Sequence, residues 1–514
     1  MSRLRHANRM LAATVLIALI AGCSPTTPSP SEPSATDVAA VPSTPASPSP
    51  AATPAVAPAR WTDCGKGFLC ADVRVPSDYA SPATGYMDIS ILESPATDRS
   101  QRIGSLVIDP GGPGASGVDF VREAVGAKVF PDELRRRFDI VGFDPRGVNS
   151  STAIRCIDNL DPQAELDPTP DDAAQITALV DSARDYAGEC AKRNDATLPY
   201  LSTDAVARDL DLIRAAVGDE RLTYLGFSYG TLIGSLYADL FPDHVRAMVL
   251  DGAIDPAIDL QQLRFGQAKG FEQALTDFLD YCATRPTCEF HEGGKSAEAF
   301  DALMASIDKK PLPATLIKST REVGPGLAWF GVVAALYSTD SWRTLATALS
   351  LAKSGDGSLL LLLADPYRGR KPNGSYSNLQ DAYTANTCLD YPAPTDVSVY
   401  TTWARELQAA APHFAKILAY NDLACAFWPV PAERTPKPVS AAGAPPIVVV
   451  GSTRDPATPY AWATSLAKEL DSGVLVTRDG DGHTGYQASL CVRKAVDGYL
   501  MDLVVPKDGL TCTS

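Results

Sequence analysis

The chain has 514 residues and a formal net charge of −16, from 61 acidic and 45 basic side chains. An acidic surface of this kind argues against binding to nucleic acid and against electrostatic binding to anionic lipid. The length exceeds what one compact domain needs, so we expect a large insertion or a second domain.

The N-terminus has the pattern of a bacterial lipoprotein signal peptide over residues 1–22. Basic residues precede the apolar run 10–20, which is too short for a convincing transmembrane helix. The run ends in Leu-Ile-Ala-Gly-Cys, which is similar to a lipobox in which Cys23 is lipidated after cleavage. Several acyl chains on one residue anchor a protein stably. We therefore expect a lipoprotein of the bacterial cell membrane, facing the extracytoplasmic side and held to the membrane through Cys23.

Residues 23–60 follow the signal peptide and consist almost wholly of Ser, Thr, Pro and Ala after the cysteine. Such a segment cannot bury a hydrophobic core, so we expect an extended linker. O-linked sugars on this linker and a bare linker both fit the composition.

A short apolar strand at 106–109 is expected to run into the glycine-rich loop 110–117. The backbone N–H of Gly112, with Gly111 close by, can approach a developing negative charge, so we assign this loop to an oxyanion hole. Phosphate binding is the alternative, but no Gly-Lys-Ser/Thr follows the loop. A later strand is followed by Asp144-Pro145-Arg146-Gly147, a loop that we expect an ion pair of Arg146 to fix.

The segment 222–231 reads as a buried strand, a Gly-x-Ser-x-Gly turn and the start of a helix. Gly226 and Gly230 remove side chains where strand and helix nearly collide, so Ser228 can occupy a strained turn with its hydroxyl exposed. Ser228 is therefore the candidate nucleophile, and the N–H of Tyr229 is the second expected oxyanion donor. The alternative is a helix start flanked by glycines that has no catalytic role. A candidate base and a candidate acid elsewhere in the chain would argue against this alternative.

Residues 256–440 separate two strand-rich regions and are expected to form a mostly helical cap over Ser228. The segments 271–279 and 327–336 have the apolar faces of helices. A run of five leucines at 359–363 is too short to span a membrane and favours a buried helix.

The apolar run 446–451 is typical of a parallel strand buried on both faces, and the loop after it carries Asp455. Asp455 is the expected acid that orients the base. The alternatives are a turn residue in an Asp-Pro pair and Asp251, at the end of the strand after the nucleophile helix. Asp455 is favoured by its loop and by its spacing from His483.

His483 is the expected general base among five histidines. It lies in a glycine-rich loop directly after an apolar strand, whereas a structural loop histidine is the alternative. The other four lie in the predicted signal peptide, before a strand or in the predicted insertion: His6, His244, His291 and His413. The resulting chain order, Ser228, Asp455, His483, is the order found in α/β-hydrolases.

Four motifs together give the chain a resemblance to a known family. They are Asp109-Pro110-Gly111-Gly112-Pro113-Gly114, Asp144-Pro145-Arg146-Gly147, Gly226-Phe227-Ser228-Tyr229-Gly230-Thr231, and the loops of Asp455 and Gly482-His483. With the spacing between them, they resemble the secreted tripeptidyl aminopeptidases of the α/β-hydrolase superfamily, relatives of the proline iminopeptidases. Asp109-Pro110 stands where proline iminopeptidases usually have a histidine before the glycines, which favours the tripeptidyl branch.

The resemblance implies an α/β-hydrolase fold, with a mostly parallel sheet, flanking helices and a helical cap. The core is then expected at 61–255 and 441–514, with the cap at 256–440 between them. The implied activity is release of short peptides from substrates with free N-termini, although some relatives act chiefly as esterases. A serine mechanism of this kind needs no cofactor and no metal.

An aminopeptidase must also bind the protonated N-terminus of its substrate, which calls for a carboxylate in the cap. Asp390 is the first candidate, because a disulfide at Cys388 would hold its loop rigid. Glu289, beside Cys288, is the second. Solvated cap carboxylates are the alternative for both.

Ten cysteines remain when Cys23 is set aside, an even number that suits an oxidising compartment. The sequence alone leaves the pairing open. Proximity favours the pairs Cys64–Cys70, Cys156–Cys190, Cys282–Cys288, Cys388–Cys425 and Cys491–Cys512. Metal binding is the alternative, but no Cys-x-x-Cys is present and the histidines are scattered.

Two other functions stay open at this stage. An esterase or lipase could use the same triad without needing a free amine, and a catalytically silent binding protein could share the fold. An epoxide hydrolase or dehalogenase is disfavoured, because these enzymes normally carry aspartate at the elbow, where this chain has Ser228.

Overall fold

The computed structural model describes residues 56–513. The predicted signal peptide, the predicted lipidation site at Cys23 and most of the predicted linker lie outside these residues. Residues 56–513 contain no helix with the length and apolar character that crossing a bilayer requires.

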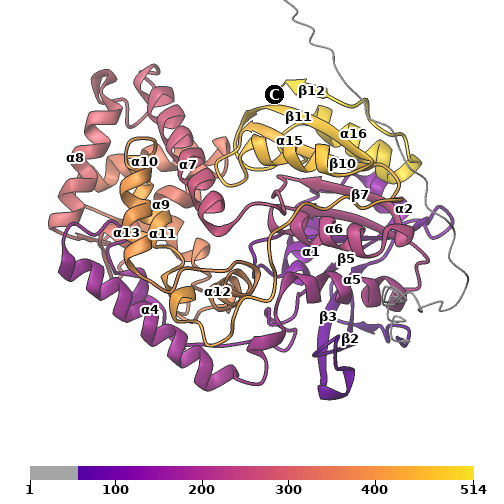
Figure 1. Cartoon of the computed structure of the whole chain (residues 1–514). Helices are drawn as coiled ribbons and strands as arrows, with labels where there is room; N and C mark the ends of the chain where they lie inside the picture. The colour runs from indigo at the N-terminus through magenta and orange to yellow at the C-terminus, as the bar shows by residue number, and fades with distance from the viewer. Residues whose placement is uncertain (1–55, 514) are drawn as a thin grey trace, which may run out of the picture. The chain divides into compact units, whose positions relative to one another are not determined.

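A mixed sheet of ten strands forms the centre of the fold (Figure 1). Strands β1 to β3 pair in antiparallel fashion, and β3 pairs antiparallel with β5. From β5 onward every neighbouring pair in the sheet is parallel. The order across the sheet is β1 (Thr62–Asp63), β2 (Leu69–Pro76), β3 (Tyr86–Ser94), β5 (Phe138–Phe143), β4 (Gly104–Asp109), β6 (Leu222–Phe227), β7 (Val245–Asp251), β10 (Ile447–Arg454), β11 (Gly473–Asp481) and β12 (Leu510–Thr513).

Helices cover both faces of this sheet, as the α/β prediction requires. Side chains of a strand alternate between the faces, so Tyr224 lies in the hydrophobic cluster of one face and Leu225 in that of the other. The first cluster includes side chains of α5 (Thr203–Ala216), α6 (Tyr229–Leu240) and α15 (Tyr460–Glu469). The second includes α1 (Gly117–Gly126), α2 (Asp132–Arg137) and α16 (Leu490–Asp502). Burial on both faces explains the continuous apolar runs of these strands.

The parallel strands β4, β6, β10 and β11 all point the same way. Their carboxyl ends therefore lie along one edge of the sheet, which is where ligands bind in open α/β sheets. The loops at these ends carry the glycine-rich segment, Ser228, Asp455 and His483.

The cap is a group of helices between β7 and β10, with a hydrophobic core of its own that includes Phe278 and Leu345. The leucine run 359–363 lies in one of these helices, where Leu360 and Leu361 are buried. The cap contains α7 (Leu260–Ala283), α8 (Ser296–Lys309), the hairpin β8 (Leu312–Pro313) and β9 (Glu322–Val323), α9 (Pro325–Leu336), α10 (Trp342–Lys353), α11 (Ser358–Tyr367), α12 (Leu379–Asp390), α13 (Ser398–Leu407) and α14 (Ala415–Tyr420).

Two earlier helices also belong to the cap side of the molecule: α3 (Asp161–Ala164) and α4 (Ala173–Asn194). Apolar residues of α4, such as Leu179, pack against a cluster that holds Tyr400 and Trp403 of α13. Arg184 of α4 also stacks over the ring of Phe427, 4.7 Å from its centroid. The expected core at 61–255 includes α4, because the positions of the strands in the sequence define that range. The sequence does not show which helices the apolar face of α4 packs against.

Five disulfides join the ten cysteines of the described residues, in the pairs that proximity favours. Cys388–Cys425 links α12 to the turn after α14, and Cys491–Cys512 links α16 to β12. Closing these loops lowers the entropy of the unfolded chain and holds the ends of the elements together.

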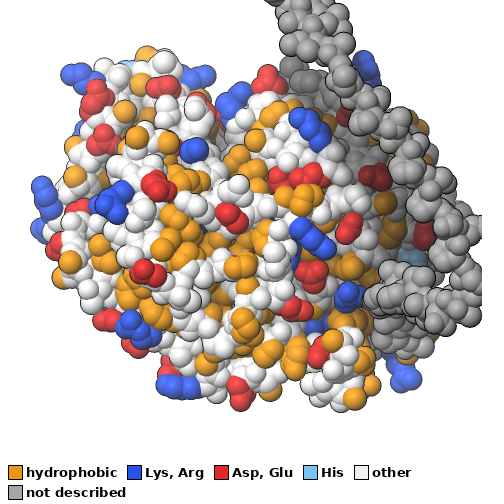
Figure 2. Space-filling view, viewed as in Figure 1, with side chains coloured by type: hydrophobic (Ala, Val, Ile, Leu, Met, Phe, Trp, Pro, Cys, Tyr) orange, Lys and Arg blue, Asp and Glu red, His pale blue; other side chains and the backbone are white. Residues whose placement is uncertain are grey.

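Charged side chains of both signs are scattered over the face of the protein that Figure 2 shows. On this face the described residues form no broad basic area of the kind that neutralises phosphates.

Arg146 is buried in the loop after β5 and forms an ion pair with Asp209 of α5. Its Nε donates to one carboxylate oxygen at 2.7 Å, and a terminal nitrogen donates to the other. Its remaining N–H groups donate to the carbonyls of Pro76, Ser77 and Tyr200. The expected ion pair is thus present, and it ties β2, β5 and α5 together.

Replacing Arg146 by Met should therefore leave Asp209 buried without its cation and destabilise the fold by about 3–5 kcal/mol. Chemical denaturation of the purified protein measures this loss. The double variant Arg146→Met/Asp209→Leu should recover much of it, because it removes both charges. Arg184→Met removes an exposed ion pair with Asp181 and the stacking on Phe427, and should change stability by no more than about 1–2 kcal/mol. Equal effects of Arg146→Met and Arg184→Met would contradict this account.

Candidate active site

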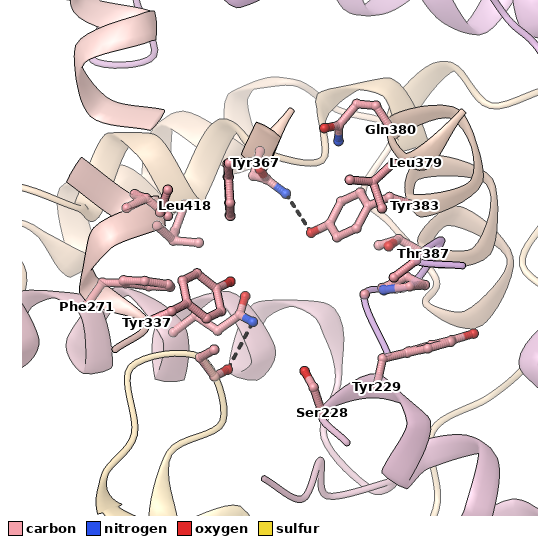
Figure 3. A pocket seen from close by; sticks show the side chains of 18 of the residues that line it. Ser228, Tyr229, Phe271, Tyr337, Tyr367, Leu379, Gln380, Tyr383, Thr387 and Leu418 are labelled. Carbon is pink, nitrogen blue, oxygen red and sulfur yellow. Dashed lines mark hydrogen bonds between the residues drawn. The ribbon is translucent and has the colours of Figure 1, made fainter. Parts of the chain in front are cut away.

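A cavity of about 490 Å³ lies where the cap covers the carboxyl edge of the sheet (Figure 3). Ser228 lies at one side of the cavity, with its hydroxyl pointing inward. His483 and Gly112 also line it, so the structure brings residues of three distant loops to one place. The cap supplies most of the remaining wall, including Phe271, Trp329, Phe330, Tyr337, Tyr367, Leu379, Tyr383, Asp390 and Leu418.

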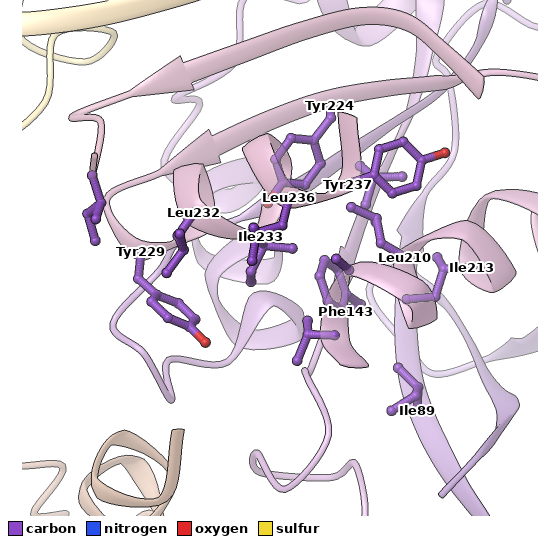
Figure 4. Close-up of a cluster of buried hydrophobic side chains, with 14 of the residues drawn as sticks. Ile89, Phe143, Leu210, Ile213, Tyr224, Tyr229, Leu232, Ile233, Leu236 and Tyr237 are labelled. Atoms are coloured by element: carbon purple, nitrogen blue, oxygen red, sulfur yellow. The ribbon is translucent and has the colours of Figure 1, made fainter. Parts of the chain in front are cut away.

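Ser228 occupies a sharp turn between β6 and α6, with φ 54° and ψ −123°. A residue with a side chain rarely adopts positive φ, so the surrounding structure must hold this turn in place. The Ser228 N–H donates to the main-chain oxygen of Asp251 at 2.9 Å. Behind the turn, α6 is buried along most of its length, and Figure 4 shows its residues Leu232, Ile233 and Leu236 in the same buried cluster as Tyr224.

Glycines make this turn sterically possible. A Cβ on Gly226 would lie 2.5 Å from the Gly230 oxygen, and a Cβ on Gly230 would lie 2.8 Å from the main-chain oxygen of Asp109. Gly111, at φ 90°, approaches the turn from the other side, and a Cβ there would lie 2.5 Å from the Phe227 oxygen. No other residue fits these positions without moving the backbone, which explains the Gly-x-Ser-x-Gly pattern.

His483 lies in the loop after β11 and contacts Asp455, which follows β10. Its Nδ1 lies 2.9 Å and 3.0 Å from the two carboxylate oxygens of Asp455. The carboxylate also accepts hydrogen bonds from the N–H groups of Ala457, Thr458 and Thr484. With Nδ1–H donating to Asp455, Nε2 is the acceptor nitrogen, and it has no hydrogen-bond partner among residues 56–513. Nε2 is therefore available to take a proton from a nucleophile.

Two electrostatic effects act on the imidazole in opposite directions. Burial lowers the pKa of His483, but the negative charges of Asp455 and Asp251 outweigh burial and raise this pKa above its usual value. The backbone N–H of His483 donates to the oxygen of Tyr337 in the cap at 2.8 Å, and the Tyr337 ring meets the imidazole edge-on. The base is therefore held by both the core and the cap.

The carboxylate of Asp251, the alternative acid, contacts the backbone after His483 and not the imidazole. Its carboxylate is buried and accepts hydrogen bonds from the N–H groups of Gly485 (2.8 Å) and Tyr486 (2.8 Å). Burial raises the pKa of Asp251 to about 6. The structure thus places Asp455 against the imidazole, whereas Asp251 holds the backbone that follows it.

The predicted oxyanion donors differ in their hydrogen bonding. Tyr229 is the first residue of α6, where helical N–H groups lack an intrahelical partner. The Gly112 N–H also makes no hydrogen bond within the described part of the chain. The N–H of Gly111, the residue expected close to this hole, donates instead to the Asp109 carboxylate at 2.7 Å. Gly111 instead leaves room for the turn at Ser228.

Asp390, the first predicted amine-binding residue, lines the same cavity as Ser228. Its carboxylate accepts hydrogen bonds from the N–H and hydroxyl of Thr203 and from the hydroxyl of Tyr229. Burial raises the pKa of Asp390 to about 6, so its carboxyl group is mainly ionised at neutral pH. Among residues 56–513 this carboxylate forms no ion pair.

Glu289, the second predicted amine-binding residue, is exposed and does not line the cavity. The structure does not bring it to Ser228. The disulfide Cys282–Cys288 beside it closes a turn at the end of α7, not a loop that faces the core.

Several residues that line the cavity or contact its wall carried no signal in the sequence. Thr203 begins α5 and meets Asp390, which lies 187 positions later in the chain. Arg264 and Arg368 of the cap bring two cations to the wall. Tertiary contacts alone reveal these side chains. The described residues contain no group of three or more His, Cys, Asp or Glu side chains arranged to hold a metal ion.

Two known families match the chain. A family described as alpha/beta hydrolase fold matches residues 104–298, and one described as TAP-like protein matches residues 411–512. The chain is 39% identical over 480 residues to serine protease Hip1 of Mycobacterium tuberculosis, covering 88% of this chain and 91% of that one. It is 36% identical over 487 residues to carboxylesterase B of the same organism, covering 89% and 91%. It is 35% identical over 477 residues to a tripeptidyl aminopeptidase of Streptomyces lividans, covering 88% and 86%.

The chain belongs to the TAP-like α/β-hydrolases. The resemblance seen in the motifs and the α/β-hydrolase fold are thereby confirmed. This TAP-like hydrolase is an enzyme, which leaves the catalytically silent binding protein without support. Among solved structures, the proline iminopeptidase of Mycobacterium smegmatis has a TM-score of 0.36 at 13% identity, covering 84% of this chain and 99% of that one. A likeness at that level adds nothing to the assignment.

The geometry of this TAP-like hydrolase predicts different effects for its two candidate acids. Asp455→Asn should lower kcat on a simple ester by about 10,000-fold, because it removes the acceptor that orients and charges the imidazole. Asp251→Asn should lower the melting temperature, because the amide cannot accept all the hydrogen bonds of Gly485 and Tyr486. The kcat of Asp251→Asn should fall less than the kcat of Asp455→Asn. Steady-state kinetics and calorimetry on both variants test this, and the reverse order of the two kcat losses would contradict it.

The raised pKa of His483 predicts the pH dependence of the TAP-like hydrolase. Only the neutral imidazole accepts a proton, so kcat/KM should fall as the pH drops through the pKa of the folded protein. An ester substrate without ionisable groups isolates this effect. The acid limb should have its midpoint above 6.5, the usual value for histidine. A midpoint below 6.5 would mean that burial, not Asp455, dominates at the imidazole.

Proposed function

We propose that this TAP-like hydrolase is a serine exopeptidase that releases di- or tripeptides from substrates with free N-termini. The relatives named serine protease and tripeptidyl aminopeptidase support peptide hydrolysis. We further propose that the protein acts outside the cytoplasm, anchored through lipidated Cys23. The signal-peptide pattern and the lipobox-like sequence support this location.

In the proposed reaction Ser228 attacks the carbonyl carbon of the scissile peptide bond while His483 takes its proton at Nε2. The carbonyl oxygen becomes an oxyanion, which the N–H groups of Tyr229 and Gly112 stabilise. The intermediate collapses when the C–N bond breaks and the imidazolium gives its proton to the leaving amine. Water, deprotonated by His483, then attacks the acyl carbon, and the C–O bond to Ser228 breaks as the imidazolium returns its proton to the serine oxygen. Asp455 keeps Nδ1 protonated and stabilises the imidazolium throughout.

The position of Asp390 in the cavity is the observation that carries the exopeptidase assignment. Its ionised carboxylate contacts the hydroxyl of Tyr229, the residue after the nucleophile, and lies in the wall of the cavity. Arg434, the cation that lowers its pKa, forms no ion pair with it and stacks on Tyr391 instead. A protonated substrate amine would supply the missing partner for a buried charge.

The size of the cavity agrees with an exopeptidase. A volume of about 490 Å³ falls within the range of pockets for small ligands. The end of a peptide fits such a space, whereas the middle of a folded chain does not. The aromatic wall adds apolar contact area for the side chains of the first residues.

Ester hydrolysis is the second candidate function. The relative named carboxylesterase B and the mainly apolar cavity wall favour it. An esterase would use the same triad and oxyanion hole, but would have no need of the charge on Asp390.

Comparing three substrates separates these functions: a tripeptide anilide with a free amine, its N-acetylated form and a short-chain ester. The proposal predicts rapid cleavage of the free-amine peptide, at least about tenfold slower cleavage of the acetylated one, and loss of both activities in Ser228→Ala. Cleavage of the ester alone would identify an esterase. Equal cleavage of the two peptides would exclude recognition of the amine.

Asp390→Asn should lower kcat/KM for the free-amine peptide by about tenfold or more, since it removes a charged hydrogen-bond partner. The loss on the acetylated peptide should be much smaller. Glu289→Gln is the matched control, because it neutralises a cap carboxylate that is exposed and outside the cavity. If Glu289→Gln and Asp390→Asn have the same effect, Asp390 does not bind the amine.

A further inference from the structure

Two arginines line the cavity, and their surroundings differ. Arg264 of α7 is buried and donates from Nε and a terminal nitrogen to both carboxylate oxygens of Asp422. Its other terminal nitrogen donates to Gln267 at 2.6 Å. The charge of Arg264 is therefore compensated within the protein, and this residue holds the cap together.

Arg368 lies directly after α11 and has no such partner. Its guanidinium makes no hydrogen bond and no ion pair with any residue from 56 to 513, and its Nε is buried. The nearest carboxylate in the sequence, Asp365, pairs with Arg321 and Arg370 instead. A guanidinium stays protonated under all ordinary conditions, so the cavity wall carries an uncompensated positive charge here.

Aromatic side chains hold Arg368 in place. The guanidinium lies over the ring of Phe330, 4.4 Å from its centroid, and both residues line the cavity. The titratable groups that face it are Tyr186, Tyr367 and Tyr376. Burial raises the pKa of each phenol, so all three are uncharged at neutral pH. Stacking fixes the plane of the guanidinium and leaves its N–H fork without a partner.

Arg368 is half-buried, and its Nε is buried without a partner. Charged groups that are removed from water are normally paired, because leaving them uncompensated is unfavourable. Planar guanidinium groups match carboxylates through two parallel hydrogen bonds. The protein as a whole is acidic, so it repels anions except where a local cation attracts them. An unpaired arginine in the cavity thus marks a place for an anionic group of the ligand.

The position of this charge relates it to the reaction. Tyr367, which precedes Arg368, lies across the cavity from Ser228 (Figure 3). Asp390, in contrast, contacts the residue next to Ser228. The two unpaired charges of opposite sign therefore lie in one cavity and can be engaged by one molecule that has both an amine and a carboxylate.

We propose that Arg368 binds a carboxylate of the peptide substrate, so that the enzyme selects acidic peptides. This inference rests on the proposed function and names the substrate class of the same site. The carboxylate can belong to an acidic side chain or to the C-terminus of a short peptide, and the guanidinium recognises both in the same way.

The test uses two series of substrates with the full-length protein. In the first series, tripeptide anilides with a free amine carry Glu or Gln at each position in turn. The anilide replaces the C-terminal carboxylate, so only the side chains can supply a negative charge. In the second, short peptides end in a free carboxylate or in an amide. In at least one of these pairs, the substrate with the carboxylate should have a kcat/KM about tenfold or more above that of its neutral partner. A ratio of this size is the scale of a charged hydrogen bond. Arg368→Met should reduce that ratio to near one.

Two further variants control for effects on folding and on general charge. Arg368→Lys keeps the charge without the planar fork and should retain part of the preference. Arg343→Met removes an exposed arginine of the cap helix α10 that does not line the cavity, and should keep the wild-type ratio. Melting temperatures of all variants identify any that fail to fold.

Equilibrium binding to Ser228→Ala separates this proposal from the proposed function. Tighter binding of the acidic peptides, lost when Arg368→Met is added, would support the carboxylate site even if the wild type hydrolysed no peptide. Ratios near one in the wild type, or ratios that survive Arg368→Met, would overturn the proposal. If the neutral peptides are cleaved in that case, the exopeptidase assignment still stands.

Discussion

Asp251 joins the two loops on which the active site depends. Its main-chain oxygen accepts the N–H of Ser228, and its carboxylate accepts the N–H groups of Gly485 and Tyr486, 234 and 235 positions later in the chain. A buried carboxylate is unfavourable unless such donors satisfy it, so each loop stabilises the residue that positions the other. The separation between nucleophile and base is thereby set by one residue of β7, and neither loop can shift without breaking a buried hydrogen bond.

The cavity above these loops contains few charges, and each has a distinct environment. Arg264 is compensated by Asp422, whereas Asp390 and Arg368 have no ion-pair partner within the described residues. Aromatic and aliphatic side chains surround them, and an apolar environment strengthens any interaction that a ligand makes with them. Binding can then depend on a small number of polar contacts, while the apolar wall supplies area without selecting among side chains.

The parts of the site that are contiguous in sequence could be predicted, and the parts that depend on the cap could not. Ser228 and His483 lie in glycine-rich loops after strands, and such loops have a local pattern. In the cap, a neighbouring cysteine predicts both Asp390 and Glu289, but the structure brings only Asp390 to the cavity, because the disulfide beside Glu289 closes an exposed turn. Arg368 lies at the end of an apolar helix, and only tertiary packing reveals that it lines the cavity without a partner. The assignment of α4 to the cap side likewise follows from its partners.

The hydrogen bond from His483 to the Tyr337 carbonyl makes the cap a structural part of the catalytic apparatus. The base is oriented from below by Asp455 and from above by the backbone that follows α9. A cap of this kind is not an interchangeable module: exchanging it for that of a relative would also exchange one of the supports of the histidine. New specificities in this architecture should therefore arise by replacing side chains on the existing helices, and only with difficulty by grafting whole caps.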